Sequence, residues 1–299
     1  MRRSLVIGTR GSALALAQSS LAETALRAAH PDIAVEVKTI TTSGDRRVDF
    51  AALQASGAGA KGLFTKEIEI ALADGQIDVA VHSAKDLPGQ AGEGGLTIAA
   101  VLPRANPRDV LISKNAASFS KLAGAARIGT SSVRRKRQLL WLRPDLEIVE
   151  MRGNVPTRIE KLRAAETLDG IVLARAGLDR LALNLDDLFM SELEIFPAAG
   201  QGIVALQARA DDTTTIALLK AINHAPSFTF LRAEREFLRL LDGDCNLPVG
   251  VESIARGSRL EMKAITFRDD ETKPRRAEAD GEANDPEAVA SRLFERLSN

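Results

Sequence analysis

The 299-residue chain has one cysteine, one tryptophan, no tyrosine and three histidines. A single cysteine excludes an internal disulfide. His30, His82 and His224 lie far apart in the sequence, so no Cys/His group has the spacing of a metal centre, and we expect no bound metal. The shortage of aromatic rings that stack on bases also counts against DNA or RNA as a partner.

The chain has no excess of either charge, because 40 Lys and Arg residues balance 40 Asp and Glu residues. A protein that coats a polyanion would have an excess of cations. No apolar run approaches the length of a membrane-spanning helix. The apolar stretch that follows Arg2 and Arg3 is too short for a signal peptide. We therefore expect a cytoplasmic protein with neither a nucleic-acid nor a membrane partner.

Short apolar runs alternate with amphipathic segments, a rhythm that is typical of a parallel sheet with covering helices. The expected strands cover residues 4–8, 33–40, 77–81, 96–102, 109–113, 126–130, 146–150 and 169–173. The expected helices cover residues 13–29, a segment that Thr65 caps, a segment that starts at Ser131, and residues 155–165 and 174–181. Residues 41–62 form a long, glycine-rich stretch, which is typical of a lid or of a disordered loop.

The rhythm contains a weak internal repeat. Residues 7–12 (IGTRGS) resemble residues 128–132 (IGTSS), and residues 77–81 (IDVAV) resemble residues 168–172 (LDGIV). Linker-like segments at 103–108 and 195–202 frame the second copy. The repeat predicts two α/β lobes joined by two crossings with a hinged cleft, and chance similarity is the alternative.

The remainder of the chain has another character. It reads as an amphipathic helix at 229–241, alternating strands at 249–255, 260–266 and 275–279, and a final helix near 286–297. We therefore expect three domains. The first covers residues 1–102 and is completed by 201–220, where an apolar run returns as a strand. The second covers 103–200, and a small α+β domain covers 221–299.

The stretch from Ile77 to Pro88 begins as an apolar strand and ends in ionisable side chains. Open α/β sheets bind ligands at the carboxyl ends of their strands. Asp86 is the candidate proton carrier and would stabilise a cation on a substrate. Lys85 would pair with a substrate carboxylate or form a Schiff base. The alternative is a solvated Lys85–Asp86 pair on a surface turn, and His82 reads as a structural histidine.

Arginines recur where a strand passes into a helix. A cation at a helix N-terminus opposes the macrodipole and costs about 0.3–1 kcal/mol. A bound anion reverses the sign of that effect. The pattern therefore predicts an anion-binding cleft for a polycarboxylate or phosphate, whereas the alternative is a set of cations that solvate helix surfaces. The arginines are Arg10, Arg134, Arg135, Arg152, Arg158 and Arg180.

The lone Cys245 lies in a polar turn, DGDCNLP, after the amphipathic helix. A lone cysteine is commonly a small buried hydrophobe. A turn rich in Gly, Asp and Asn is unlike that setting, so a covalent role stays open beside the structural one.

Six motifs in chain order resemble the hydroxymethylbilane synthase (porphobilinogen deaminase) family. They are HSAKD at 82–86, GTSSVRR at 129–135, RGNV at 152–155, AGL at 176–178, GQG at 200–202 and GDC at 243–245. The resemblance implies a transferase that condenses four porphobilinogen molecules head to tail, with release of ammonia, into a linear tetrapyrrole for haem and related pigments. It also implies two lobes like those of periplasmic binding proteins, a third domain and a monomer.

The resemblance also implies roles for single residues. Cys245 would carry a dipyrromethane cofactor through a thioether, and Asp86 would be catalytic. The cofactor-binding residues would be Ser83, Lys85, Thr130, Ser131, Ser132, Arg134, Arg135, Arg158 and Arg180. The substrate-binding residues would be Arg10, Ser12, Lys61, Arg152 and Gln201.

Two residues depart from the family pattern: Ala84 stands where methionine is usual, and Asp244 where glycine is common. We expect the first to change packing only, and the second either to slow cofactor loading or to have no effect. The rival interpretations are a non-catalytic two-lobed protein that binds an anionic solute, and an enzyme fold without activity. A binding protein has no need of Cys245 or Asp86.

Overall fold

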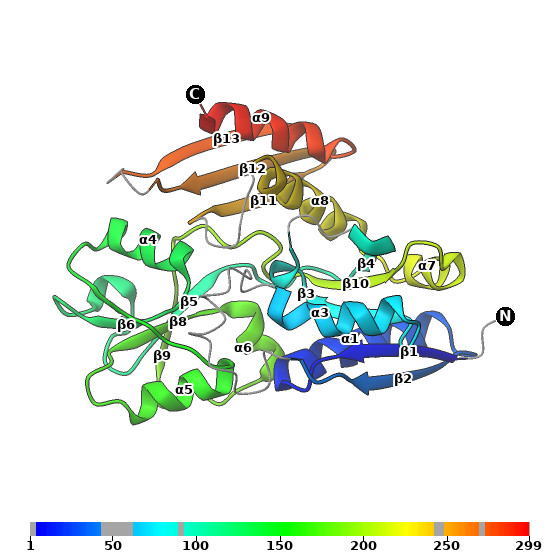
Figure 1. Cartoon of the computed structure of the whole chain (residues 1–299). Helices are drawn as coiled ribbons and strands as arrows, with labels where there is room; N and C mark the ends of the chain where they lie inside the picture. The colour runs from blue at the N-terminus through cyan, green and yellow to red at the C-terminus, as the bar shows by residue number, and fades with distance from the viewer. Residues whose placement is uncertain (1–3, 43–61, 89–92, 242–247, 269–272, 299) are drawn as a thin grey trace. The chain divides into compact units, whose positions relative to one another are not determined.

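A computed structural model describes residues 4–42, 62–88, 93–241, 248–268 and 273–298 (Figure 1). The chain forms two compact units, Met1–Arg104 with Ile203–Cys245, and Ala105–Gly202 with Asn246–Asn299. Lys61, Asp244, Cys245 and most of the glycine-rich stretch lie outside the described residues. None of the helices in the described ranges is long and apolar enough to cross a membrane.

The first unit contains a five-stranded mixed sheet. Its order is β2 (Ala34–Thr39), β1 (Ser4–Thr9), β3 (Val79–Ser83), β10 (Val204–Arg209) and β4 (Leu96–Val101). Strands β1, β2 and β3 are parallel, and β10 runs antiparallel to both β3 and β4. The apolar run after the second linker therefore returns to this sheet, as expected. The helices of this unit are α1 (Ala13–Ala29), α3 (Gly62–Ala73), α7 (Thr213–Lys220) and α8 (Ala225–Leu240).

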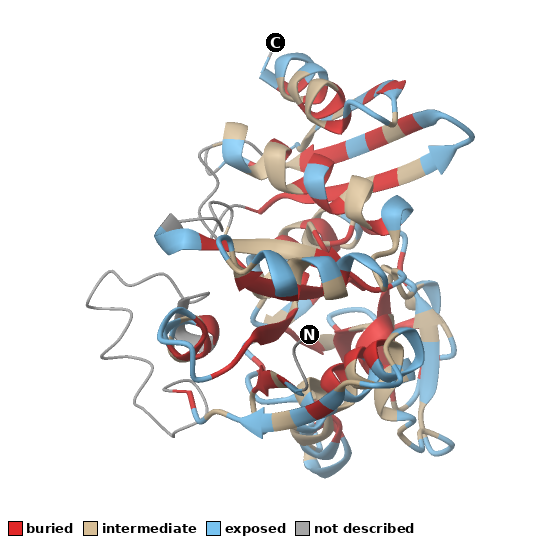
Figure 2. Cartoon of the chain, turned by 90° about the vertical axis from the view of Figure 1, so that its right-hand side faces the viewer, coloured by how far each residue is buried: buried red, intermediate tan, exposed pale blue. Residues whose placement is uncertain are grey.

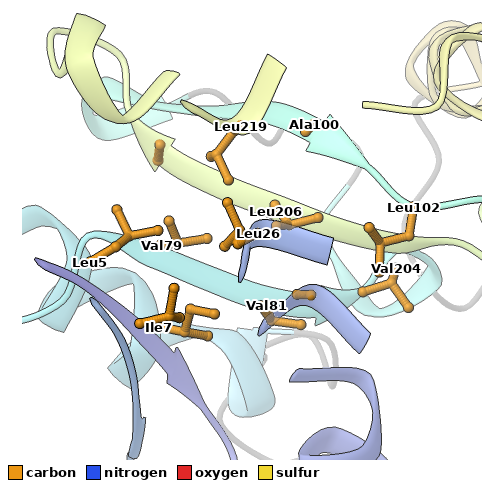
Figure 3. Packing of buried hydrophobic residues seen from close by; sticks show 13 residues of the cluster. Leu5, Ile7, Leu26, Val79, Val81, Ala100, Leu102, Val204, Leu206 and Leu219 are labelled. Carbon is orange, nitrogen blue, oxygen red and sulfur yellow. The ribbon is translucent and has the colours of Figure 1, made fainter. Parts of the chain in front are cut away.

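The core of the first unit lies on both faces of its sheet. On one face Leu26 of α1 and Leu219 of α7 pack with strand residues such as Val79 and Leu206 (Figure 3). On the other face Ile68 and Leu72 of α3 pack with Ala80. Because side chains alternate along β3, its even-numbered residues, including His82, face the side of the sheet that α3 covers.

The second unit contains a sheet of the same design. Its order is β7 (Glu147–Val149), β6 (Arg127–Gly129), β8 (Gly170–Ala174), β5 (Asp109–Ser113) and β9 (Phe189–Glu192). Strands β6, β7 and β8 are parallel, and β5 runs antiparallel to β8 and β9. The helices are α4 (Val133–Leu142), α5 (Val155–Ala164) and α6 (Arg175–Leu181).

The C-terminal part of the second unit is an antiparallel sheet with one helix. Strands β11 (Gly250–Arg256), β12 (Arg259–Thr266) and β13 (Arg275–Glu282) pair in chain order, and α9 (Pro286–Ser298) follows. Val289, Leu293 and Leu297 form the buried side of α9, and Figure 2 shows this helix buried on one side and exposed on the other.

The strand registers confirm the internal repeat. Gly8 of β1 pairs with Ala80 of β3, and Gly129 of β6 pairs with Ile171 of β8. These are the two pairs of segments that the sequence matched. The fold class, two α/β lobes plus a small domain with an antiparallel sheet and helix, is therefore confirmed, whereas the hinged cleft and the domain boundaries stay predictions. Helix α8 belongs to the first compact unit.

Three details differ from the sequence-based expectations. Helix α3 begins at Gly62, so Thr65 lies inside its first turns and donates a hydrogen bond to Glu69 instead of capping the helix. Helix α8 begins at Ala225, four residues earlier than expected, because the His224 side chain accepts a hydrogen bond from the Ser227 N–H as its N-cap. The short elements β9 and α7 were not expected, since four and eight residues give too little periodicity to detect.

Candidate active site

In the first unit, two of the predicted site residues are serines near the carboxyl ends of strands. Ser12 follows β1, and Ser83 is the last residue of β3. Ser12 is the N-cap of α1, and its Oγ accepts a hydrogen bond from the Ala15 N–H at 3.3 Å. Ser83 ends β3 and forms hydrogen bonds with the amide of Gln18 on α1, at 2.8 and 3.2 Å. Gln18 is buried, and its hydrogen bonds join helix α1, which follows β1, to the carboxyl end of β3. The half-buried Arg10 lies just before the helix.

The residues Ala84–Asp86 form a 3-10 turn directly after β3. The Ala84 N–H donates to the Ile203 carbonyl at 3.0 Å. Ala84 and Leu87 are buried in a cluster with Leu231 of α8, which leaves Lys85 and Asp86 half-buried on the other side of the turn. The departure at Ala84 thus lies in the core and not among the ionisable groups.

His82 is buried beneath this turn. Burial lowers its pKa to about 4; a hydrogen bond with Gln207 opposes the shift, and the charge of Arg10 adds to it. Gln207 in turn donates from Nε2 to Glu69 Oε1 at 3.1 Å. His82 is therefore a neutral, structural side chain near neutral pH, as the sequence suggested.

In the second unit, three hydroxyl groups surround the start of α4. Ser132 is the N-cap of this helix, and its Oγ accepts from the Arg135 N–H at 3.4 Å. Thr130 Oγ1 accepts from the Ser132 N–H at 3.2 Å. Ser131 Oγ donates to the Met151 carbonyl at 2.7 Å, which joins the start of α4 to the segment after β7.

Asp109, the first residue of β5, is the centre of a buried ionic network that the sequence did not reveal. Its Oδ2 accepts from Arg134 at 2.7 Å. Its Oδ1 accepts from Arg135 Nε and Nη2, at 3.1 and 2.7 Å, and from Gln201 Nε2 at 2.9 Å. Asp109 has no exposed surface, and both arginines are 6% exposed. Arg134 and Arg135, expected as cofactor ligands, thus have a protein carboxylate as a partner.

The network carries an uncompensated positive charge, because two guanidinium groups share one carboxylate. Burial by itself would raise the pKa of Asp109, but Arg134 and Arg135 hold that pKa well below its usual range. The pKa of Arg134 is lowered by burial and also by the charge of Arg135, although Asp109 opposes both effects. The carboxylate therefore stays ionised, and the net charge of the buried group is positive.

Two further arginines add to this charge. Arg158 Nε donates to the Gly153 carbonyl at 2.7 Å, and burial together with the charge of Arg135 lowers its pKa to about 10. Arg180 donates to the Gly202 carbonyl at 2.7 Å, and burial lowers its pKa against the opposing effect of Asp179. Within the described residues, neither guanidinium forms an ion pair.

The remaining predicted residue of this unit, Arg152, is in a different setting. It is exposed and forms an ion pair with Glu150 at 2.5 Å. The structure therefore brings Arg134, Arg135, Arg158 and the start of α4 into one positively charged region and leaves Arg152 on the surface beside a carboxylate. Such a region favours a ligand with several carboxylates.

Four glutamine and aspartate side chains with buried hydrogen bonds were missed: Gln18, Asp109, Gln207, and Gln138, whose Oε1 accepts from the Phe196 N–H at 2.7 Å. Gln138 follows Arg134 and Arg135 by four and three residues, so it lies on the same face of α4 as these motif residues. That spacing was a usable signal for Gln138, whereas α1 carries no motif residue that would single out Gln18. Asp109 is the first residue of β5 and Gln207 lies inside β10, and nothing in the local sequence separates them from ordinary surface residues.

Comparison with known proteins gives two family models that together cover most of the chain. "Porphobilinogen deaminase, dipyromethane cofactor binding domain" matches residues 5–217, and "Porphobilinogen deaminase, C-terminal domain" matches residues 228–299.

Curated relatives agree with these models. A porphobilinogen deaminase from Syntrophomonas wolfei is 49% identical over 265 residues, which cover 88% of this chain and 85% of that protein. One from Desulforudis audaxviator is 44% identical over 298 residues, which cover 99% of this chain and 95% of that protein. Among solved structures, the methionine binding protein MetQ aligns with a TM-score of 0.47 and 14% identity, over 76% of this chain and 93% of that chain.

Replacing Asp109 by asparagine tests the buried network. Asp109→Asn leaves two buried guanidinium groups without a counter-charge, so we expect the free energy of unfolding to fall by about 3–5 kcal/mol. Urea unfolding monitored by circular dichroism measures this change. The control is Asp145→Asn in the same unit, where an exposed aspartate pairs with Arg143. It is expected to leave the midpoint unchanged, and an equal midpoint shift in both variants would contradict the assignment.

Proposed function

The chain belongs to the porphobilinogen deaminase family, and on that basis we propose which of its residues bind the cofactor, bind the substrate and catalyse the reaction. The enzyme is a transferase that condenses four porphobilinogen molecules head to tail and releases one ammonia at each step. The product is the linear tetrapyrrole hydroxymethylbilane, a precursor of porphyrins. A dipyrromethane cofactor primes the chain. The observation that supports our assignment most is the buried, uncompensated positive charge around α4, since substrate and product both carry acetate and propionate groups.

The residues of the second unit suit a dipyrromethane group. This group carries several carboxylates, and Arg158 and Arg180 are partly buried cations without a carboxylate partner in the described chain. Arg134 and Arg135 bring one further net positive charge. Thr130, Ser131 and Ser132 surround a helix N-terminus, where an anion is stabilised. When bound, the cofactor supplies the pyrrole carbon to which the first substrate is joined.

In our proposal Cys245 holds the cofactor through a thioether, and the residues that match the family pattern bind it. The first unit contributes Ser83 and Lys85. The second unit contributes the carboxylate-binding cations and hydroxyls Thr130, Ser131, Ser132, Arg134, Arg135, Arg158 and Arg180. Substrate would be bound by Arg10, Ser12, Lys61, Arg152 and Gln201. The buried Gln201 donates to Asp109 and to the Pro107 carbonyl, so it would act mainly by holding the network.

Asp86 is proposed to be the catalytic carboxylate. Loss of ammonia from porphobilinogen breaks a C–N bond and leaves a cation, which a fixed carboxylate stabilises. The bound cofactor would supply the free pyrrole carbon for the new C–C bond, and Asp86 would accept the proton that this carbon releases. Burial of Ala84 and Leu87 on either side holds this turn in place, so little reorganisation accompanies each step.

We also propose that the enzyme acts as a monomer in the cytoplasm and binds no nucleic acid. The family pattern supports the monomer, and the balanced charge of the chain supports the absence of a nucleic-acid partner.

Replacing Asp86 by asparagine tests the catalytic assignment. Asp86→Asn removes the negative charge and the proton acceptor but keeps the shape, so we expect kcat to fall about 10²–10⁴-fold while the cofactor stays attached. Release of ammonia from porphobilinogen measures turnover. Asp74→Asn, an exposed aspartate after α3 in the same unit, is the matched control with unchanged kcat. Normal turnover by Asp86→Asn would refute the role.

Replacing Arg158 by glutamine tests the anion site. A hydrogen bond to a charged group contributes about 1.5–3 kcal/mol, so Arg158→Gln should weaken the binding of a carboxylate-rich ligand by about 10- to 100-fold. Apo-enzyme loading at increasing porphobilinogen concentrations measures this change. Arg163→Gln lies on the same helix, but its guanidinium pairs with Asp187 on the surface, so it should load like the wild type. Equal loading of all three proteins would contradict the assignment.

A further inference from the structure

We propose that Gln138 is a positioning residue for the guanidinium of Arg134: it fixes the main-chain carbonyl of Phe196, and that carbonyl sets the orientation of the guanidinium. The proposal rests on the proposed function, because it takes Arg134 as one of the residues that bind the carboxylates of the cofactor. Every residue involved belongs to the second unit and lies in the described ranges.

The guanidinium of Arg134 is held by the protein through one of its three nitrogens. Its Nη1 donates to Asp109 Oδ2 at 2.7 Å and to the Phe196 carbonyl at 2.5 Å. These two bonds use both hydrogens of Nη1, whereas a guanidinium has five N–H groups. Within the described residues, Nε and Nη2 donate no hydrogen bond to the protein, so three N–H groups are left for a ligand. A carboxylate binds two parallel N–H groups of an arginine, so the plane of the guanidinium decides whether both bonds can form.

Gln138 fixes the carbonyl to which Arg134 donates. Its Nε2 donates to the Phe196 carbonyl at 3.0 Å, and its Oε1 accepts from the Phe196 N–H at 2.7 Å. Gln138 follows Arg134 by four residues, so the two side chains lie on one face of α4. It is only 1% exposed. One buried amide thus pairs with both the donor and the acceptor of Phe196, much as a neighbouring strand would, and holds the carbonyl toward Arg134.

The segment that contains Phe196 is also fixed before and after this residue. The Leu193 N–H donates to the Asp109 carbonyl at 2.9 Å, and the Val251 N–H donates to the Pro197 carbonyl at 2.9 Å. Asp109 therefore holds the guanidinium through its side chain and the Phe196 segment through its main chain. Two fixed acceptors on one nitrogen define the orientation of a planar guanidinium.

Gly250, the first residue of β11, leaves room for this carbonyl. A Cβ atom on Gly250 would lie 2.8 Å from the Phe196 carbonyl oxygen, 2.5 Å from Phe196 Cβ and 3.1 Å from Gln138 Nε2. Gly250 is absent from the residues with positive φ, so close backbone approach is the reason that glycine fits here. A side chain at this position would displace the Phe196 carbonyl without removing the Gln138 amide.

The test measures how readily the full-length chain, prepared without cofactor, takes up pyrrole groups from porphobilinogen. Gln138→Met removes both hydrogen bonds at a similar side-chain length, and Gly250→Ala displaces the carbonyl but keeps the amide. The control is Trp141→Leu on the same helix, whose ring centroid lies 4.0 Å from the guanidinium carbon of Arg276 on β13. For each protein we would measure bound pyrrole per chain with p-dimethylaminobenzaldehyde at increasing porphobilinogen concentrations, and the melting temperature.

Gln138→Met and Gly250→Ala should each raise the porphobilinogen concentration for half-maximal loading about tenfold. This is the lower end of the range for losing a hydrogen bond to a charged group, because the guanidinium is misoriented but still present. Trp141→Leu should load at the wild-type concentration even where its melting temperature falls. In an Arg134→Lys background, which lacks the planar guanidinium, Gln138→Met should cause no further change, because no guanidinium is left to orient.

Wild-type loading by Gln138→Met, an equal loss of loading in Trp141→Leu, or a further tenfold loss in the Arg134→Lys background would each overturn the proposal. If Gln138→Met does not fold, the comparison of Gly250→Ala with Trp141→Leu decides it. A wild-type protein that takes up no pyrrole from porphobilinogen would instead contradict the proposed function itself, so the two failures are distinguishable.

Discussion

One buried carboxylate, that of Asp109, shared between the guanidinium groups of Arg134 and Arg135, organises the second unit. Three parts of the chain meet at this carboxylate: the start of β5, the first turn of α4 and Gln201. Removing a partner from such a group is strongly unfavourable, because it leaves a charge in a low-dielectric interior. The position of α4 is therefore fixed by electrostatics as well as by packing.

The same arrangement is the basis for the proposal that this unit binds a carboxylate-rich ligand. One anion for two cations leaves a net positive charge, and Arg158 and Arg180 add two further partly buried cations. A substrate with acetate and propionate groups supplies the missing negative charge, and each further condensed unit supplies more. In the first unit the arrangement is different: neutral His82 and the buried Ala84 and Leu87 support a turn that presents Lys85 and Asp86. In the proposed assignment, the second unit binds anions and the first unit presents the catalytic carboxylate of Asp86.

Much of the fold was predictable, because it depends on local pattern. The two lobes were predicted because the sequence of β1 matches that of β6 and the sequence of β3 matches that of β8. Similar short sequences form equivalent strands in the two sheets. The positions of Asp86, Arg134 and Arg135 followed from the rule that strand ends carry the ligand-binding groups, whereas Arg158 lies inside α5 and Arg180 lies in the last turn of α6. Elements of four or eight residues, such as β9 and α7, were missed because they show only about two periods of a pattern.

The buried polar pairings were not predictable from one sequence. Asp109 looks like the first residue of an ordinary strand, and its partners lie 25, 26 and 92 residues away. Gly250 looks like any glycine in a strand, yet Phe196 approaches it from 54 residues earlier in the chain. Only the folded backbone shows which side chains share one buried space.

The most direct test of this account is the mass of the denatured wild-type protein, measured before and after incubation with porphobilinogen and then mapped to peptides. The account predicts a mass above that of the polypeptide, by two linked pyrroles, on the peptide that contains Cys245. A protein that has only the polypeptide mass, and that gains nothing from excess porphobilinogen, would contradict it.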